Sequence, residues 1–70
     1  MINEKDVKIN GIYQLEQDGT TIDVVICKIV DDWLVYFKAF YKGNVTEWNY
    51  FTSLKEFSSL ATLKEVAKND

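Results

Sequence analysis

The segment WLVYFKAFYKGNVTEWNYF, residues 33–51, decides the fold of this chain. It holds eight of the ten aromatic residues, and the pair Gly43–Asn44 divides it into two runs rich in valine and aromatic residues. Such residues are enriched in strands, and glycine at the first central position suits a type II′ hairpin turn. The segment therefore predicts two antiparallel strands, over about 33–42 and 45–52.

Two further turn signals extend this hairpin toward the N-terminus. Asp18–Gly19 follows GIYQLEQ, and Asp-Gly is the preferred pair for a type I′ turn because both central residues need positive φ. Asp31–Asp32 separates ICKIV from WLVYF and is a weaker signal, since it lacks glycine. The sequence thus predicts four consecutive antiparallel strands, with the first two over about 7–17 and 20–30.

Two-residue turns at these positions give one consistent register. The predicted pairs are Leu15/Ile22, Tyr13/Val24, Val30/Trp33, Ile26/Phe37, Val24/Ala39, Ala39/Trp48 and Phe37/Tyr50. Because opposed residues share a face, most large apolar side chains gather on one face, which we expect to be the core. Its members are Val7, Ile9, Tyr13, Leu15, Ile22, Val24, Ile26, Val30, Trp33, Val35, Phe37, Ala39, Tyr41, Trp48 and Tyr50, with Lys28 and Thr46 as polar exceptions.

The opposite face is more apolar than a solvated sheet face should be. It holds Ile12, Val25, Cys27, Ile29, Leu34, Tyr36, Phe40 and Phe51 among Gln14, Asp23, Lys38, Glu47 and Asn49. The register places Tyr36 beside Phe51, and Phe40 opposite Glu47. Aromatic residues with a polar rim are typical of an interface centre. The candidate partner-binding residues are Tyr36, Lys38, Phe40, Glu47, Asn49 and Phe51; the alternative is that a C-terminal helix covers them through Phe57 and Leu60.

That helix is predicted in TSLKEFSSLATLKEVAKND, residues 52–70. Ser53 with Glu56, and Thr62 with Glu65, match the capping-box pattern. We expect a helix over about 53–67. The alternative is a short helix that stops near Ser59, followed by a second helical turn or a strand from Thr62, so continuation of the helix over 62–68 stays open.

The fold class expected from these elements is mainly β. Four long, twisted strands and a trailing helix resemble the architecture of SH3-like barrels, in which an antiparallel meander curls until its apolar face closes on itself. This resemblance concerns shape and implies no activity. The alternative is an α+β fold with an open four-stranded antiparallel sheet and the helix on one face. Either way, residues 1–70 are expected to form a single domain.

The composition argues against catalysis, metal binding and cofactor binding. The chain has no histidine, so the usual acid–base partner is missing, and the lone Cys27 is expected to be an inert residue within a strand. Asp31–Asp32 is better explained as a turn than as a carboxylate pair. The three glycines are scattered, and no phosphate-binding loop is predicted. The opening MINEKDVKIN contains no apolar run long enough for a signal peptide or a membrane span, so a cytoplasmic protein is expected.

We therefore expect a non-catalytic protein–protein interaction module, an accessory protein of a prophage or mobile element. It would dock on a protein partner or self-associate, for example as a homodimer, through the aromatic sheet face. The alternative is a small nucleic-acid-binding β-barrel that uses a lysine-bearing edge with Lys38, Lys42 and Lys55. The absence of arginine and the net charge of −3 count against nucleic acid. An aromatic cage for a cation, built from Tyr13 and Trp33, is a weaker hypothesis.

Overall fold

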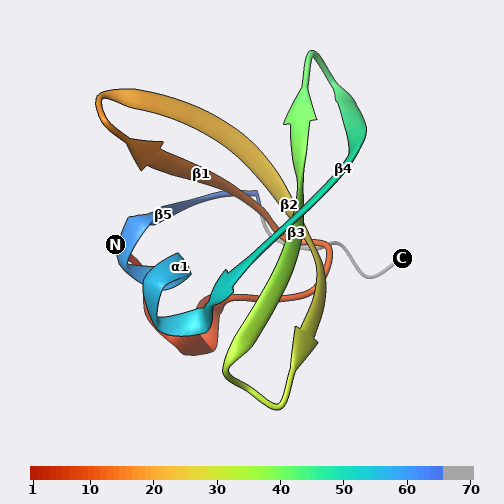
Figure 1. Cartoon of the computed structure of the whole chain (residues 1–70). Helices are drawn as coiled ribbons and strands as arrows, with labels where there is room; N and C mark the ends of the chain where they lie inside the picture. The colour runs from red at the N-terminus through yellow and green to blue at the C-terminus, as the bar shows by residue number, and fades with distance from the viewer. Residues whose placement is uncertain (66–70) are drawn as a thin grey trace.

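The computed structural model describes residues 1–65, except for the side chains of Gln17, Trp48, Lys64 and Glu65. The elements in chain order are the 3₁₀-helix η1 (Glu4–Asp6), the strands β1 (Ile12–Gln17), β2 (Thr20–Val30), β3 (Leu34–Tyr41) and β4 (Asn44–Ser53), the helix α1 (Leu54–Leu60) and the strand β5 (Ala61–Glu65). All strand pairs are antiparallel, in the order β4-β3-β2-β1-β5 (Figure 1). A mainly β fold with an antiparallel meander and a following helix is therefore confirmed.

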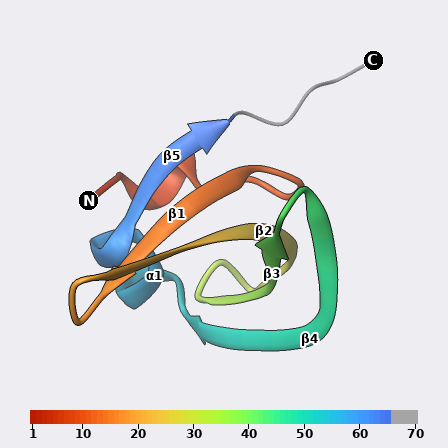
Figure 2. The same cartoon turned by 90° about the horizontal axis from the view of Figure 1, so that it is seen from above.

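The sheet curls around α1, which lies between β1 and β4 when the molecule is seen from above (Figure 2). Within residues 1–65 no pairing joins the two edge strands, β4 and β5. The sheet is thus not closed, and the predicted SH3-like barrel is not confirmed. The alternative open sheet was expected to have four strands, whereas the structure adds β5 beside β1.

The C-terminal helix is shorter than the prediction of about 53–67. It begins as the first capping box predicts, because the Ser53 hydroxyl oxygen accepts a hydrogen bond from the backbone N–H of Glu56 at 3.1 Å. It ends at Leu60, and Ala61 is extended, with φ −91° and ψ 148°. In the last turn, the Ser58 hydroxyl donates to the Lys55 carbonyl and the Ser59 hydroxyl donates to the Glu56 carbonyl. Such side-chain hydrogen bonds compete with those of the helix backbone, which makes serine a poor helix former.

A strand follows where the second capping box predicted more helix. Residues 61–65 pair with β1, so Thr62 lies opposite Gln14 and Leu63 lies opposite Tyr13. This pairing covers an edge of β1 that would otherwise be open, a gain that the local sequence does not reveal. The helix prediction for 61–65 is wrong, and the alternative with a strand from Thr62 is confirmed. Residues 66–70, including the end of the predicted helix, lie outside the described residues.

The first strand begins at Ile12 and not at about residue 7. Asn10 has a φ of 69°, which interrupts an extended chain, and the N–H of Gly11 donates to the carbonyl of Lys8 at 3.0 Å. The chain nevertheless stays beside β2, because Asn10 N–H donates to the Ile26 carbonyl at 2.9 Å. Ile9 therefore lies outside the sheet and is exposed, contrary to its predicted core position.

The three hairpin turns differ in how well the sequence predicted them. Asp18 and Gly19 have φ values of 52° and 78°, as the predicted type I′ turn requires, and every predicted β1–β2 pair is confirmed. The next turn includes Trp33, so Val30 pairs with Leu34 rather than with Trp33. The register between β2 and β3 shifts at Cys27, and beyond this irregularity Ile26 pairs with Phe37 as predicted.

The β3–β4 turn lies one residue earlier than predicted, and extra residues in β4 then restore the predicted register. Lys42 and Gly43, with φ values of 51° and 80°, form its centre, and Tyr41 pairs with Asn44. The extra residues 46–48 lie opposite Ala39, so the predicted pair Phe37/Tyr50 is restored beyond them. The predicted Ala39/Trp48 pair is absent from this ladder.

The core lies on the concave side of the curled sheet, which we call the inner face. The buried residues of β1, β2 and β3 all belong to the predicted core face; they are Tyr13, Val24, Ile26, Val35, Phe37 and Ala39. Phe57 of α1 is fully buried against them, with its ring centre 5.5 Å from that of Tyr13 and 5.3 Å from that of Phe37. Val7, Leu54 and Ala61 complete the cluster.

Four further residues of the predicted core face are exposed. Trp33 lies in the β2–β3 loop, and Tyr41 flanks the β3–β4 turn. Ile22 and Tyr50 lie on the inner face but are not buried, because α1 occupies only part of the curl. The irregularity at Cys27 also moves three residues to the face opposite the predicted one. Ile29 pairs with Val35 and packs against the core, whereas Lys28 pairs with Tyr36 and Val30 pairs with Leu34 on the other side of the sheet. The predicted core position of Val30 is therefore wrong.

Candidate docking surface on the outer face

The convex side of β1–β4 carries a second apolar surface, which we call the outer face. Side chains alternate along a strand, so residues between the buried inner-face residues point away from α1. The apolar members of the outer face are Ile12, Val25, Val30, Leu34, Tyr36, Phe40, Val45 and Phe51. None of these eight side chains is fully buried. The sheet therefore presents apolar surface on both sides, and α1 covers only one.

Tyr36 and Phe51 form the aromatic centre of the outer face. They are directly paired across β3 and β4, as the sequence predicted, and their ring centres lie 5.7 Å apart at an interplanar angle of 38°. Phe51 is 68% exposed, while Tyr36 is half-buried. A large aromatic side chain with most of its area in water is the kind of residue that gains most from entering an interface.

The remaining predicted site residues lie around this centre. Lys38 pairs with Asn49, and both share the outer face with the aromatic pair. Phe40, which is half-buried, pairs with Val45 and not with Glu47, because the shifted turn changes the register there. Glu47 lies among the extra residues opposite Ala39 and is exposed.

The sequence reasoning missed Val45 as a member of this surface. Val45 is 49% exposed and lies opposite Phe40, where it extends the apolar area toward the β3–β4 turn. A turn centred on Lys42–Gly43 rather than on Gly43–Asn44 would have placed it correctly. Both turn assignments put glycine at a central position, so the residue types alone did not distinguish them.

The alternative in which α1 covers the outer face does not hold for this structure. Leu54 and Phe57 enter the core on the inner face, and Leu60 is exposed near the N-terminus. α1 contacts the sheet on the inner face, where the Phe57 ring packs edge-to-face on Tyr13. Tyr36, Phe40 and Phe51 are therefore left without helical cover.

Charges around the outer face are mixed. Lys28 of β2 pairs with Tyr36, and Lys38 of β3 pairs with Asn49. The acidic residue Asp23 pairs with Phe40. The lysines of the nucleic-acid alternative are more dispersed: Lys38 lies in the middle of β3, Lys42 in the β3–β4 turn over the Tyr41 ring, and Lys55 on α1. These three residues thus come from different parts of the fold.

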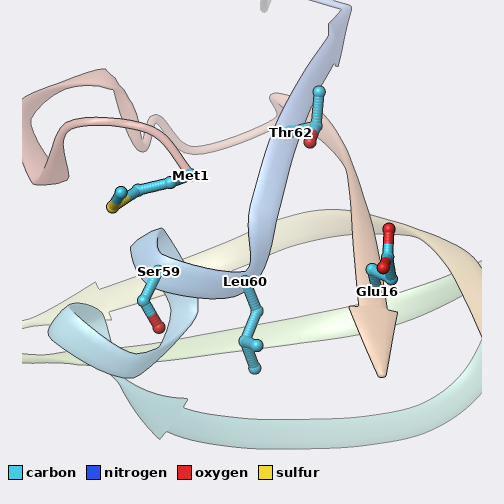
Figure 3. Close-up of a pocket in the computed structure, with 5 residues that line it drawn as sticks. All are labelled: Met1, Glu16, Ser59, Leu60 and Thr62. Carbon is cyan, nitrogen blue, oxygen red and sulfur yellow. The ribbon is translucent and has the colours of Figure 1, made fainter. Parts of the chain in front are cut away.

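Described residues also line two hollows away from the outer face. The first, with a volume of about 210 Å³, is an apolar groove on the inner face lined by Leu15, Ile22, Val24, Phe37 and Tyr50. It occupies the part of the curl that α1 leaves open. The second, of about 260 Å³, is lined by Met1, Glu16, Ser59, Leu60 and Thr62 (Figure 3). The polar ends of its side chains do not point toward a common centre (Figure 3).

Groups that could support chemistry are sparse within residues 1–65. No three His, Cys, Asp or Glu side chains lie together in a way that could hold a metal ion. Cys27 is exposed at the β2 irregularity, although the sequence suggested a residue among apolar neighbours. Tyr13 and Trp33 do not form a cage, because Tyr13 is buried against Phe57 while Trp33 lies in an exposed loop. Of the helices in this part of the chain, none is long and apolar enough to cross a membrane.

The Tyr13 hydroxyl has a structural role. It donates to the carbonyl of Asp6 at 2.7 Å and accepts from the N–H of Lys8 at 2.8 Å, and so ties the N-terminal segment to the core. Burial raises the pKa of this hydroxyl, and the Asp6 carboxylate adds to the rise, while the hydrogen bond from Lys8 opposes it. Gly11 permits this arrangement, since a Cβ atom there would lie 2.7 Å from the Tyr13 hydroxyl oxygen.

Comparison with protein-family models, with curated proteins and with solved structures finds no match to this chain.

Proposed function

We propose that this chain is a non-catalytic protein–protein interaction module that binds a protein partner through the outer face. The observation that carries the proposal is the open Tyr36–Phe51 pair, on the side of the sheet opposite α1. The half-buried Phe40, the exposed Val45 and the half-buried aliphatic residues of the outer face extend the apolar area, and Lys38, Glu47 and Asn49 supply a polar rim. An apolar centre with a polar rim is the usual anatomy of a protein interface.

The partner should offer an apolar side chain or an aromatic ring to the space beside Phe51. A partner that covers Phe51 removes the exposed part of an apolar ring from water, and this burial stabilises the complex. Non-specific surface contacts lack such apolar area. Phe51 is therefore the residue whose loss should weaken binding most. The mixed charges of the rim favour a protein surface over the phosphates of nucleic acid, which call for concentrated positive charge.

The wider setting forms part of the same proposal. A lysine-rich, arginine-free composition is typical of AT-rich genomes, and on this ground we propose that the chain is a cytoplasmic accessory protein of a prophage or mobile element. The strand order, with a helix before the strand that returns to β1, supports an opened form of the SH3-like barrel. That architecture supports the shape of the module and no particular activity.

Site-specific photo-crosslinking tests the proposal. A photoreactive phenylalanine analogue replaces Phe51 in one protein and Trp33 in a matched control, and both are expressed in the source cell. Trp33 is also an exposed aromatic residue, at 58%, but it lies in the β2–β3 loop. We expect a discrete adduct to a protein from position 51 and none from position 33. No protein adduct at position 51, or the same adducts at both positions, would contradict the proposal.

A further inference from the structure

β4 is an edge strand whose second side has no strand beside it among the described residues. It is 10 residues long, whereas β5, the other edge strand, has 5 residues within the part of the chain that the structure describes. Edge strands present a row of backbone N–H and C=O groups that can pair with another chain. β4 is thus the longer of the two available pairing sites.

The hydrogen-bonding pattern identifies which residues of β4 face the open edge. Leu54 N–H donates to the Trp33 carbonyl at 2.7 Å, which marks the end of the ladder between β3 and β4. Hydrogen-bonded and non-hydrogen-bonded pairs alternate along an antiparallel ladder. Counting back from Leu54, Thr52 and Tyr50 direct their backbone groups toward β3. The intervening residues, Asn49, Phe51 and Ser53, direct theirs toward the open edge.

This edge lacks the features that normally prevent pairing. Natural edges are protected by lysine, proline, irregularities or short length. The sequence of β4, NVTEWNYFTS, contains no lysine and no proline, and its single charged residue is Glu47. The extra residues at 46–48 disturb the strand only before Asn49. By contrast, β5 carries Lys64 and Glu65 within its five residues. The regular and uncharged part of the edge is therefore 49–53.

We propose that a second copy of this chain pairs with β4 in antiparallel fashion, about a two-fold axis at Phe51. This inference rests on the proposed docking role of the outer face and names the partner as another copy. The regular segment 49–53 is symmetric about Phe51, so Asn49 of each copy meets Ser53 of the other. This pair and the Phe51/Phe51 pair are the hydrogen-bonded ones, and both use backbone groups that face the edge. The two sheets become one continuous sheet.

The same axis joins the two outer faces. Opposed residues in an antiparallel pair share a face, so the Phe51 rings of the two copies lie side by side and extend the Tyr36–Phe51 contact across the dimer. No like charges are opposed, because the segment 49–53 is uncharged. A self-complementary surface of this kind is what a two-fold dimer requires.

The area of the contact sets its expected strength. A phenylalanine side chain buries about 150–250 Å², so the 68% exposed fraction of Phe51 offers roughly 100–170 Å² per copy. Stable complexes bury about 800 Å² per partner, which a five-residue ladder and one ring approach only in part. We therefore expect a dissociation constant between about 1 µM and about 1 mM.

Sedimentation velocity on the full chain tests the proposal over the concentration range from about 1 µM to about 1 mM. Asn49→Pro removes an edge-facing N–H without removing an apolar side chain, and proline is tolerated on edge strands. Asn49→Ala, the matched control, keeps the N–H. We expect dimer formation by the wild type and by Asn49→Ala, and at least tenfold weaker association for Asn49→Pro. A wild type that stays monomeric, or a folded Asn49→Pro that dimerises normally, would overturn the pairing.

A crosslink keeps the test decisive if Asn49→Pro fails to fold. In a Cys27→Ser background, Phe51→Cys places two thiols opposite each other at the two-fold axis, with Cα atoms about 5.5 Å apart, a distance that a disulfide accepts. Val45→Cys is the control, since Val45 is exposed on the same strand but outside the paired segment. We expect a disulfide-linked dimer from position 51 only. Equal crosslinking at both positions, or none at 51, would refute the geometry. A monomeric protein that still crosslinks a different protein through position 51 would refute self-pairing alone and leave the docking function standing.

Discussion

Tyr13→Phe is expected to destabilise the fold although it removes only one oxygen atom. The ring of Tyr13 is 1% exposed, and its hydroxyl bridges the Asp6 carbonyl and the Lys8 N–H at 2.7 and 2.8 Å. The substitution leaves this N–H and this carbonyl without their partner beside the core. An unsatisfied buried polar group costs about 1–3 kcal/mol. Since these backbone groups are only partly buried, we expect a loss of about 1–2 kcal/mol in the free energy of unfolding.

Urea denaturation followed by far-ultraviolet circular dichroism measures this loss. For a domain of this size, 1 kcal/mol corresponds to about 4–8 °C in Tm, so thermal unfolding provides a second measurement. The denaturant slope should stay unchanged, because the core and the sheet are retained. A loss below about 0.5 kcal/mol would mean that the hydroxyl bridge does not hold the N-terminal segment, and would refute the reasoning.

The same residue predicts an alkaline dependence of stability. Because burial raises the folded-state pKa of Tyr13 above its unfolded value of 10.0, its contribution is complete below that pH and is lost as the pH rises through the folded-state pKa. The wild type should therefore lose stability above about pH 10, and Tyr13→Phe should lose less over the same range. Parallel pH profiles of the unfolding free energy for the two proteins would contradict this.

Three further substitutions test the packing and the openness of the outer face. Gly11→Ala should cost about 1–3 kcal/mol in urea denaturation, because the new Cβ would lie 2.7 Å from the Tyr13 hydroxyl oxygen and 2.8 Å from the Cε2 atom of its ring. Tyr13→Phe relieves only the first of these contacts, so the cost should fall in part in that background, and an equal cost would argue against the hydroxyl contact. Phe57→Ala removes a fully buried ring and should cost about 3–5 kcal/mol in the free energy of unfolding. Most of the chain should then be unfolded by circular dichroism, and a cooperative native-like transition would show that α1 does not fill the core. Phe51→Asp should change the unfolding free energy by less than about 1 kcal/mol, since the ring is largely in water, and unfolding of this variant would assign Phe51 to the core.

The meander could be predicted because short-range signals agreed with one another. Asp18–Gly19 specified a type I′ turn, and the alternation of apolar residues on either side fixed the register of β1 and β2. Where a turn lacked a decisive residue pair, the predicted turn was one residue off. The central pairs Ile26/Phe37 and Phe37/Tyr50 were still predicted correctly, because irregularities at Cys27 and at 46–48 restore the register in the middle of the sheet. The packing of the core thus constrains pairing more strongly than the turns do.

The errors arose where a long-range contact outweighed a local preference. The segment after Leu60 matches a capping box, yet it becomes β5 because the edge of β1 is available for pairing. The N-terminal segment alternates like a strand, yet Tyr13 and Gly11 hold it in another conformation. For the candidate site, the sequence placed Tyr36 and Phe51 together, but the Phe40/Val45 pair depended on the exact turn.

Hydroxyl-radical footprinting of Phe51 is the most direct test of the docking surface. The protein is labelled dilute, again at a concentration of about 1 mM, and again dilute in an extract of the source cell, with the exposed Trp33 as internal reference and the buried Phe57 as negative control. We predict strong labelling of Phe51 in the dilute protein and its selective protection in the concentrated protein, where a second copy binds, or in the extract, where another protein binds. Labelling of Phe51 that is as low as that of Phe57 in the dilute protein, or that is unchanged relative to Trp33 under both other conditions, would contradict a docking surface on the outer face.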